Sequence, residues 1–159
     1  MQWAKITDII LLTSFIILFV FVVLGLCQLF SRKSLKKVDR SLLAMPVPLT
    51  LMAITYFVFD KFFILNTRPN GSGEPSFPST HTMVVATIFF CVAIILPRYI
   101  KSKSAYITLD ILMLALLVLV CIGRVAANMH WISDVAGGLI FAAIFAAIYY
   151  LIIRRKKHV

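Results

Sequence analysis

The chain has 159 residues, of which 62% are apolar and only 14% are charged. A typical globular chain is about 25% charged, and the mean hydropathy here is +1.01. A soluble domain of this length has too much surface for its volume to hide so many apolar side chains. Composition therefore excludes soluble, disordered and disulfide-framework classes and predicts an integral membrane protein. The net charge of +10 must then be explained by where the charges lie.

Five apolar stretches follow one another along the chain, at residues 9–30, 42–59, 81–96, 105–125 and 132–153. About 20 apolar residues cross the hydrocarbon core as a helix, so each stretch is predicted to be a transmembrane helix. Pro46 and Pro48 are expected to kink the second helix. The third stretch is short, which indicates that residues 78–81 meet water inside the protein. We predict an all-α, polytopic transmembrane helical bundle of about five spans, forming a single domain over residues 1–159.

The cations are distributed unevenly over the links between these helices. If the helices alternate in direction, twelve Lys and Arg side chains fall on one side of the membrane and four on the other. The twelve are Arg32, Lys33, Lys36, Lys37, Arg40, Arg98, Lys101, Lys103, Arg154, Arg155, Lys156 and Lys157. The positive-inside rule puts these in the cytoplasm, with the N-terminus outside and the C-terminus cytoplasmic. We interpret the positive charge as a topology signal and a contact with anionic lipids, and expect no nucleic-acid partner.

The metal-ligating residue types are scattered. The three cysteines, Cys27, Cys91 and Cys121, each stand alone inside an apolar run and are interpreted as buried thiols. No Asp, Glu, His or Cys cluster has the spacing of a metal site. We therefore expect neither a metal nor another cofactor.

Three of the four cations on the predicted outer side lie close in sequence to histidines. Lys61 and Arg68 precede His81 in the long link after the second helix, and Arg124 precedes His130 in the turn before the last helix. The positive-inside rule would remove such cations from this side unless they had a function. Arginine matches phosphate oxygens through its planar fork of donors, so the cations predict an anion site.

Two local patterns add further chemistry to these segments. Ser79 or Thr80 is expected to cap the third helix, whose first N–H groups then attract anions. His130 and Asp134 are spaced i, i+4, so they face one another if the last helix begins near His130. The carboxylate would then fix the imidazole tautomer and stabilise its cation. Two histidines in a cationic pocket predict phosphoryl transfer through a covalent histidine intermediate, with cations offsetting the transition-state charge.

Each of these features also has an ordinary structural explanation. A Lys or Arg at a membrane boundary is most often solvated, and a histidine at a helix end is most often a cap or a core group. A His–Asp pair at i, i+4 also arises by chance. Their joint occurrence on one side of the membrane favours the functional interpretation.

Three short blocks resemble, in order, the signatures of the type 2 phosphatidic acid phosphatase superfamily. Residues 61–69 match its Lys-x6-Arg-Pro signature. Residues 78–81 read Pro-Ser-Thr-His where the family usually has Pro-Ser-Gly-His, and residues 123–134 match its Arg-x5-His-x3-Asp signature. Any one block alone is weak, but the three together are highly specific.

The resemblance implies a helical-bundle phosphatase that needs no metal. It implies that His130 is the nucleophile, that Asp134 orients it, and that His81 is the acid that protonates the leaving oxygen. The implied phosphate ligands are Lys61, Arg68, Ser79, Thr80 and Arg124. Thr80 and Gly123 depart from the family pattern, which usually has glycine and serine there, and are expected to affect specificity more than activity.

We predict an integral membrane phosphatase that hydrolyses a lipid phosphate or diphosphate on the extracytoplasmic side of the cell membrane. The first-ranked substrate is an isoprenoid diphosphate such as undecaprenyl diphosphate, with phosphatidylglycerol phosphate and phosphatidic acid as alternatives. A non-catalytic lipid-phosphate binder or transporter is the alternative of another class, and a haloperoxidase-like use of the pocket with vanadate is a third. The expected partners are the bilayer and a membrane lipid substrate, and a homo-oligomer is left open.

Overall fold

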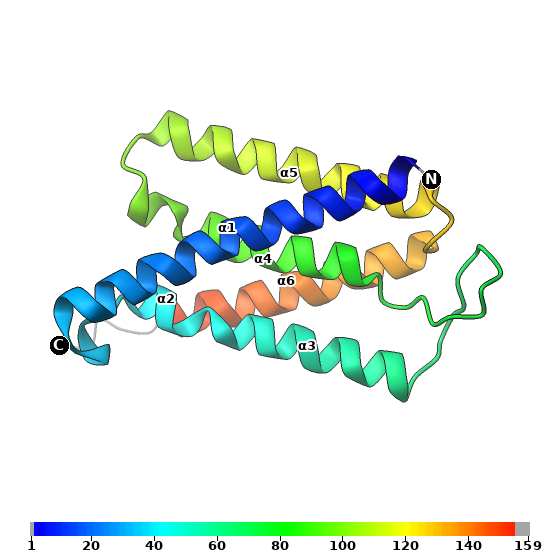
Figure 1. Cartoon of the computed structure of the whole chain (residues 1–159), viewed down its shortest axis with the longest axis horizontal. Coiled ribbons are helices and arrows are strands. Elements are labelled where there is room, and N and C mark those ends of the chain that lie inside the picture. Colours follow the sequence, from blue (N-terminus) through cyan, green and yellow to red (C-terminus); the bar gives the residue numbers. More distant parts are fainter. Residues whose placement is uncertain (1, 155–159) are drawn as a thin grey trace.

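The computed structural model describes residues 2–154. Its helices, in chain order, are α1 (Gln2–Arg32), η1 (Leu35–Lys37), α2 (Arg40–Ala44), α3 (Pro46–Lys61), α4 (Thr80–Tyr99), α5 (Lys103–Ala126) and α6 (Ile132–Arg154) (Figure 1). Five helical segments are long and apolar enough to cross a membrane, with α2 and α3 together forming one of them. The predicted all-α transmembrane bundle of five spans is therefore confirmed.

Helix α4 lies at the centre of the bundle, where α1, α3, α5 and α6 all pack against it (Figure 1). Twelve of its residues are buried, and Met83, Val85 and Ala86 have no exposed surface. The outer helices instead expose large apolar side chains such as Phe19 and Leu114, as a lipid-facing surface requires. The span predicted to be short is thus the one that the other helices shield from lipid.

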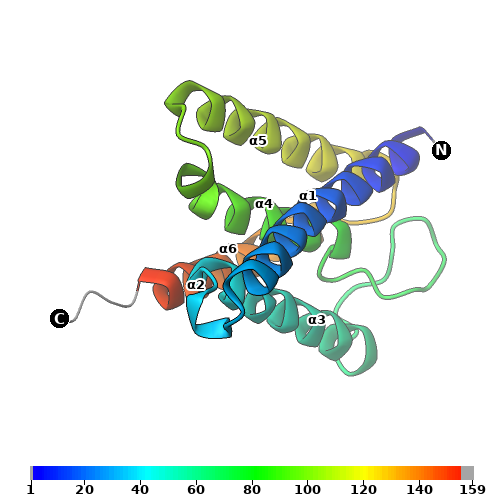
Figure 2. The same cartoon turned by 60° about the vertical axis from the view of Figure 1, so that its left-hand side comes forward.

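The two ends of the bundle differ in character (Figure 2). At the end that we call the loop end lie the start of α1, the link 62–79 and the turn 127–131. At the opposite end, which we call the basic end, lie η1, α2 and the link between α4 and α5. Residues 155–157, which complete the predicted basic tail, lie outside the described residues. The described chain begins at the loop end and leaves at the basic end, as five spans require.

Two predictions made from local sequence need correction in detail. The expected proline kink is a break between two helices, α2 and α3, that meet at Met45, because Pro46 lacks the N–H that would continue the first helix. Of the three cysteines, Cys91 is buried, Cys121 is half-buried and Cys27 is exposed on the side of α1. A thiol that faces lipid is as well accommodated as one in the core, because both surroundings are apolar.

Candidate active site

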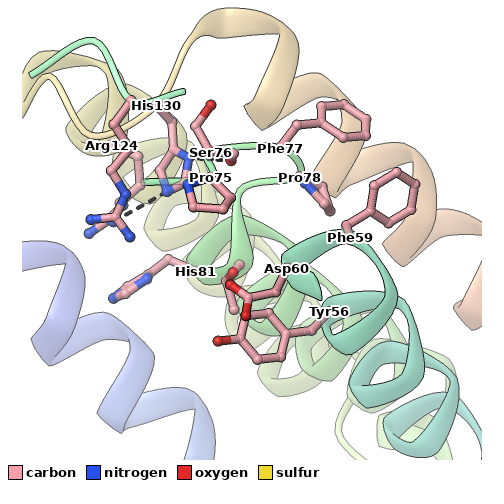
Figure 3. A pocket seen from close by; sticks show the side chains of 12 residues that line it. Tyr56, Phe59, Asp60, Pro75, Ser76, Phe77, Pro78, His81, Arg124 and His130 are labelled. Carbon is pink, nitrogen blue, oxygen red and sulfur yellow. Dashed lines mark hydrogen bonds between the residues drawn. The ribbon is translucent and has the colours of Figure 1, made fainter. Parts of the chain in front are cut away.

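A cavity of about 250 Å³ opens at the loop end, between the ends of α3 and α5, the start of α4 and the two links (Figure 3). Tyr56 and Phe59 of α3 form one side, and polar groups form the other. The chemistry-bearing side chains that line it are Asp60, Arg68, Thr80, His81, Arg124 and His130. The structure thus brings together residues from all three signature blocks, which are separated by up to 62 positions between Arg68 and His130.

His130 is held in one orientation by a backbone carbonyl and an arginine side chain. Its Nδ1 atom lies 2.8 Å from the carbonyl oxygen of Ser76, and its Nε2 atom lies 3.3 Å from Nη2 of Arg124. A carbonyl oxygen can only accept, so Nδ1 carries the proton and donates. In the neutral ring Nε2 is then the bare nitrogen, and its lone pair lies on the arginine side of the cavity (Figure 3). This tautomer is the one that a nucleophile acting through Nε2 requires.

The surroundings of His130 favour the neutral ring. Burial lowers the pKa of His130 to about 4, and the positive charge of Arg124 acts in the same direction. The hydrogen bond to Ser76 and the charge of Asp134 oppose this shift but do not cancel it. His130 is only 4% exposed. At neutral pH the imidazole is therefore uncharged and its nitrogen is available for bond formation.

Asp134 lies close to His130 but does not hydrogen bond to it. Its Oδ2 atom is 3.7 Å from Nδ1 of His130, and it accepts instead from the backbone N–H of Trp131 at 2.8 Å. Its Oδ1 atom accepts from the side-chain amide of Asn66 at 3.1 Å. Helix α6 begins at Ile132, so the pair does not lie on one helical face as the i, i+4 spacing predicts. The carboxylate reaches the histidine because it folds back over the start of the helix.

The two arginines of the pocket have donors without protein partners. Arg124 is 4% exposed, and its Nε atom is buried with no hydrogen-bond partner among the described residues. The Nε atom of Arg68 is in the same state, although its Nη1 atom pairs with Glu74 at 2.9 Å. Buried donors are normally satisfied, and each unsatisfied one is costly. The arrangement is explained if an anion completes the site.

His81 enters the cavity from the first turn of α4. Its Nε2 atom lies 2.9 Å from Oδ1 of Asp8, a residue of α1. Thr80 also lines the cavity, at the position where the family pattern has glycine. Ser79 is the N-cap residue of α4, as predicted, but its hydroxyl bonds to that of Thr82 at 3.1 Å rather than capping the helix.

Two predicted phosphate ligands do not line the cavity. Lys61 pairs with the neighbouring Asp60 at 2.8 Å, and its side chain is 61% exposed. Ser79 is fully buried beneath the segment that precedes α4. Its backbone N–H donates to the carbonyl of Asp134 at 2.9 Å, which ties the second signature block to the third. For both residues the assigned contact with phosphate stays a prediction.

A glycine on α6 allows this segment to lie against the helix. A Cβ atom at Gly138 would be 2.9 Å from the carbonyl oxygen of Ser79, closer than side-chain carbons approach. The absence of a side chain therefore lets backbone pack on backbone where the signature blocks meet. This close approach sets how near the start of α4 lies to α6.

Sequence reasoning missed several residues that shape the site. Asp8 lies outside the signature blocks, although an ionisable residue near a membrane span is a functional candidate by default. Asn66 and the Ser76 carbonyl gave no sequence signal, because their roles depend on contacts between distant segments. Asp60 lines the cavity next to Tyr56 (Figure 3), and only its place next to Lys61 in the sequence hinted at this.

The fold and the pocket together define a polytopic membrane protein with a cavity at one end that two histidines and two arginines line. A sequence profile of the PAP2 superfamily matches residues 57–158. The match covers more than half of the chain, which therefore belongs to the PAP2 superfamily. This confirms the resemblance to the type 2 phosphatidic acid phosphatases and supports a lipid phosphatase.

One solved structure has a similar fold. It is a transmembrane PAP2-type phosphatidylglycerolphosphate phosphatase from Bacillus subtilis, with a TM-score of 0.75 and 22% sequence identity. The similarity covers 99% of this chain and 77% of that one. Comparison with curated protein sequences gives no match. The structural likeness extends over α1 as well, which the family profile does not include.

Proposed function

We propose that the chain is a metal-independent phosphatase, which hydrolyses a lipid phosphate or diphosphate through a phosphohistidine at His130. The observation that carries this proposal is an unprotonated imidazole nitrogen beside two buried arginines whose Nε donors lack partners among residues 2–154. A phosphate in the cavity would satisfy the donors of Arg68 and Arg124 and would bring phosphorus to Nε2 of His130. We also infer that the whole chain acts as one phosphatase domain.

We infer a reaction in two steps. The Nε2 lone pair of His130 forms the bond to phosphorus, and the bonding pair of the P–O bond leaves with the departing oxygen. His81 gives that oxygen a proton, and the two arginines neutralise charge on the remaining oxygens. Water then attacks phosphorus and gives a proton to the now neutral His81, the N–P bonding pair returns to Nε2 of His130, and phosphate is released.

The absence of a metal requirement is part of the proposal. Among residues 2–154, no three His, Cys, Asp or Glu side chains are grouped so that they could hold a metal ion. Divalent magnesium is normally held by carboxylates together with substrate phosphates. The cavity is lined instead by two guanidinium groups, with Asp60 as the one carboxylate among its described lining residues.

The location of the cavity favours a lipid as substrate. It lies at one end of the transmembrane bundle, and Tyr56 and Phe59 line it from α3. A phosphate head in the cavity can leave its apolar tail among the lipid-facing helices. We rank an isoprenoid diphosphate first, with phosphatidylglycerol phosphate and phosphatidic acid as second candidates. The name of the Bacillus subtilis relative favours phosphatidylglycerol phosphate among these.

A phosphate-release assay tests the function. The full chain in detergent, with EDTA present, is given undecaprenyl diphosphate, phosphatidylglycerol phosphate, phosphatidic acid and a soluble sugar phosphate. We expect phosphate release from at least one lipid and none from the sugar phosphate. Adding magnesium should not change the rate of release. Binding of lipid without release would instead identify a binder or transporter. Activity that disappears in EDTA and returns with a divalent ion would refute metal independence.

We further propose that the loop end faces the outside of the cell, because the described cations gather at the basic end. Single cysteines at Ser72 and Ser31, in a chain whose three native cysteines are replaced, report the two ends. Ser72 and Ser31 are both exposed, so they form a matched pair. A membrane-impermeant thiol reagent on intact cells should label the cysteine at position 72 and not the one at 31. The reverse pattern would place the site in the cytoplasm.

A further inference from the structure

Helix α1 places one charged residue, from outside the signature blocks, in contact with a histidine of the pocket. Asp8 Oδ1 lies 2.9 Å from Nε2 of His81, although 73 positions separate the two residues. The region that matches the PAP2 profile begins at residue 57 and does not include α1. We propose that Asp8 is a positioning residue, which holds His81 in place as the charged proton donor of the reaction. This inference rests on the proposed function.

The charges around His81 explain why such a partner is needed. The charged groups that face it are Arg124 from α5, Arg68 from the link before α4, and Asp8 from α1. A protonated imidazole beside two guanidinium groups is unfavourable unless an anion compensates. Asp8 is the acid among these groups, and it also lies close enough to Arg124 to interact with its charge. The carboxylate thus supplies the counter-charge before any substrate arrives.

The proton transfer balances with Asp8 in this role. A protonated imidazole carries N–H groups on both ring nitrogens. The Nε2–H group stays bonded to Asp8, while the Nδ1–H proton passes to the departing oxygen as the P–O bond breaks. His81 is left neutral and regains a proton from water. Asp8 itself neither gains nor loses a proton, in the same way as the carboxylate of a catalytic triad.

The placement of Asp8 depends on a glycine where the family pattern usually has serine. A Cβ atom at Gly123 would lie 2.6 Å from Cγ2 of Thr7 and 3.4 Å from the ring of Trp3. Thr7 is fully buried, and its hydroxyl donates to the carbonyl of Ala4 at 2.8 Å, which holds its rotamer. A side chain at position 123 would therefore push α1 away. Gly123 lets α1 seat against α5, and the next residue after Thr7 is Asp8.

The decisive experiment compares two leaving groups. An alkyl lipid phosphate needs its leaving oxygen protonated, whereas 4-nitrophenyl phosphate has a leaving group that needs little help. Asp8→Asn should lower kcat/KM for the alkyl phosphate by about 10-fold or more, and for the aryl phosphate by less than about 2-fold. Asp8→Glu should recover most of the loss. Lys5→Gln, a charge change at an exposed position of the same helix end, should match the unmodified chain.

A double variant separates action through His81 from a general effect. In a His81→Gln chain the proton donor is already lost, so adding Asp8→Asn should cause no further loss on the alkyl phosphate. Independent, multiplying losses would show that Asp8 does not act through His81. Equal losses on both substrates from Asp8→Asn alone would also overturn the inference, because a merely structural residue affects both alike.

The seat of α1 can be tested in the same assay. Gly123→Ala should reproduce the selective loss of Asp8→Asn, and the added change Thr7→Ser, which removes Cγ2, should restore activity. Vanadate inhibition checks that Arg124, the neighbour of Gly123, still binds oxyanions in these variants. Failure of Thr7→Ser to restore activity would overturn the role of this contact. An unmodified chain that cleaves neither substrate would refute the proposed function itself. An active chain whose rates do not change in Asp8→Asn would refute only the role of Asp8.

Discussion

The two ends of the bundle each hold a cluster of polar side chains, and the clusters differ in how well they are satisfied. At the basic end, Gln28 and Asp39 bond reciprocally: the side-chain amide donates to the carboxylate at 2.8 Å, and its oxygen accepts the Asp39 backbone N–H at 2.9 Å. Tyr99 donates to the same carboxylate at 3.1 Å. The hydrogen bond from Gln28 lowers the pKa of Asp39. These contacts join α1, the start of α2 and the end of α4.

At the loop end the corresponding cluster is incomplete. The Nε atoms of Arg68 and Arg124 and the hydroxyl of Ser76 are buried without partners in the part of the chain that the structure describes, and these three residues line the cavity. In the basic-end cluster of Gln28, Asp39 and Tyr99, which we call the clasp, the donors and acceptors bond to one another and join the helices. A ligand site must instead have unpaired donors and an open cavity before the ligand binds. The candidate active site differs from the clasp in how many of its buried hydrogen-bonding groups have partners, and not in polarity itself.

The largest expected effect is the loss of the nucleophile at the loop end. His130→Ala should reduce phosphate release by about 10⁴-fold or more, because it removes the Nε2 atom that we propose forms the covalent intermediate. Trapping with a radiolabelled substrate should yield phosphohistidine in the unmodified chain and none in the variant. Phosphate release at the normal rate by a folded His130→Ala chain would disprove the mechanism.

Replacing an unsatisfied donor group should come next. Arg124→Lys exchanges a planar fork for a point charge, so we expect kcat to fall by about 10²-fold or more and vanadate inhibition to weaken. Vanadate is the right probe because it mimics the five-coordinate phosphoryl group. Unchanged vanadate affinity would show that Arg124 does not bind the oxyanion, and the contrast between the two ends would lose its basis.

Asp134→Asn should have a smaller effect on the rate. The Ser76 carbonyl, not Asp134, accepts the Nδ1 proton of His130, so the variant keeps the tautomer. We expect a loss of about 10- to 100-fold, well below the roughly 10⁴-fold seen where a carboxylate alone sets the tautomer. Vanadate inhibition should persist. If it is lost as fully as in Arg124→Lys, Asp134 holds the pocket together and its assignment as partner of His130 fails.

The clasp should respond in stability and not in chemistry. Asp39→Asn removes a charged acceptor from Gln28 and Tyr99, which should cost about 1 to 2 kcal/mol and lower the apparent Tm in detergent. The kcat of the folded protein should stay within about 2-fold, since no cavity group is touched. A large fall in kcat at unchanged Tm would mean that the two ends are coupled.

The smallest signal is the titration of His130. Because its pKa lies near 4, its ring should stay neutral down to that pH, whereas an ordinary histidine titrates near 6.5. The unfolded chain binds the proton first as pH falls, so folding stability should decline between about pH 6.5 and pH 4. Nitrogen NMR of the histidine-labelled chain, with His130→Gln to assign the signal, measures this directly. Titration near 6.5 would mean that the pocket is open to water.

Sequence alone determined the membrane class, the five spans and most of the candidate residues that line the cavity. Apolar runs of about the length of a membrane span indicate helices, because lipid cannot satisfy a free backbone group. The signature blocks carried the site, since His81, Arg68, Arg124 and His130 are all local to short, specific patterns and the structure gathers them around one cavity. Spacing also indicated that Asp134 lies near His130.

Tertiary structure decided which atoms meet. The helix start at Ile132 leaves His130 in a turn, so its proton goes to a carbonyl 54 positions earlier rather than to the acid four positions later. Lys61 turned to its neighbour Asp60, and Asp8 reached His81 because Gly123 admits α1. Periodicity and motifs describe neighbours along the chain. Contacts between helices depend on the close packing of whole surfaces. Here the missing Cβ atom of Gly123 lets α1 approach closely enough for Asp8 to contact His81.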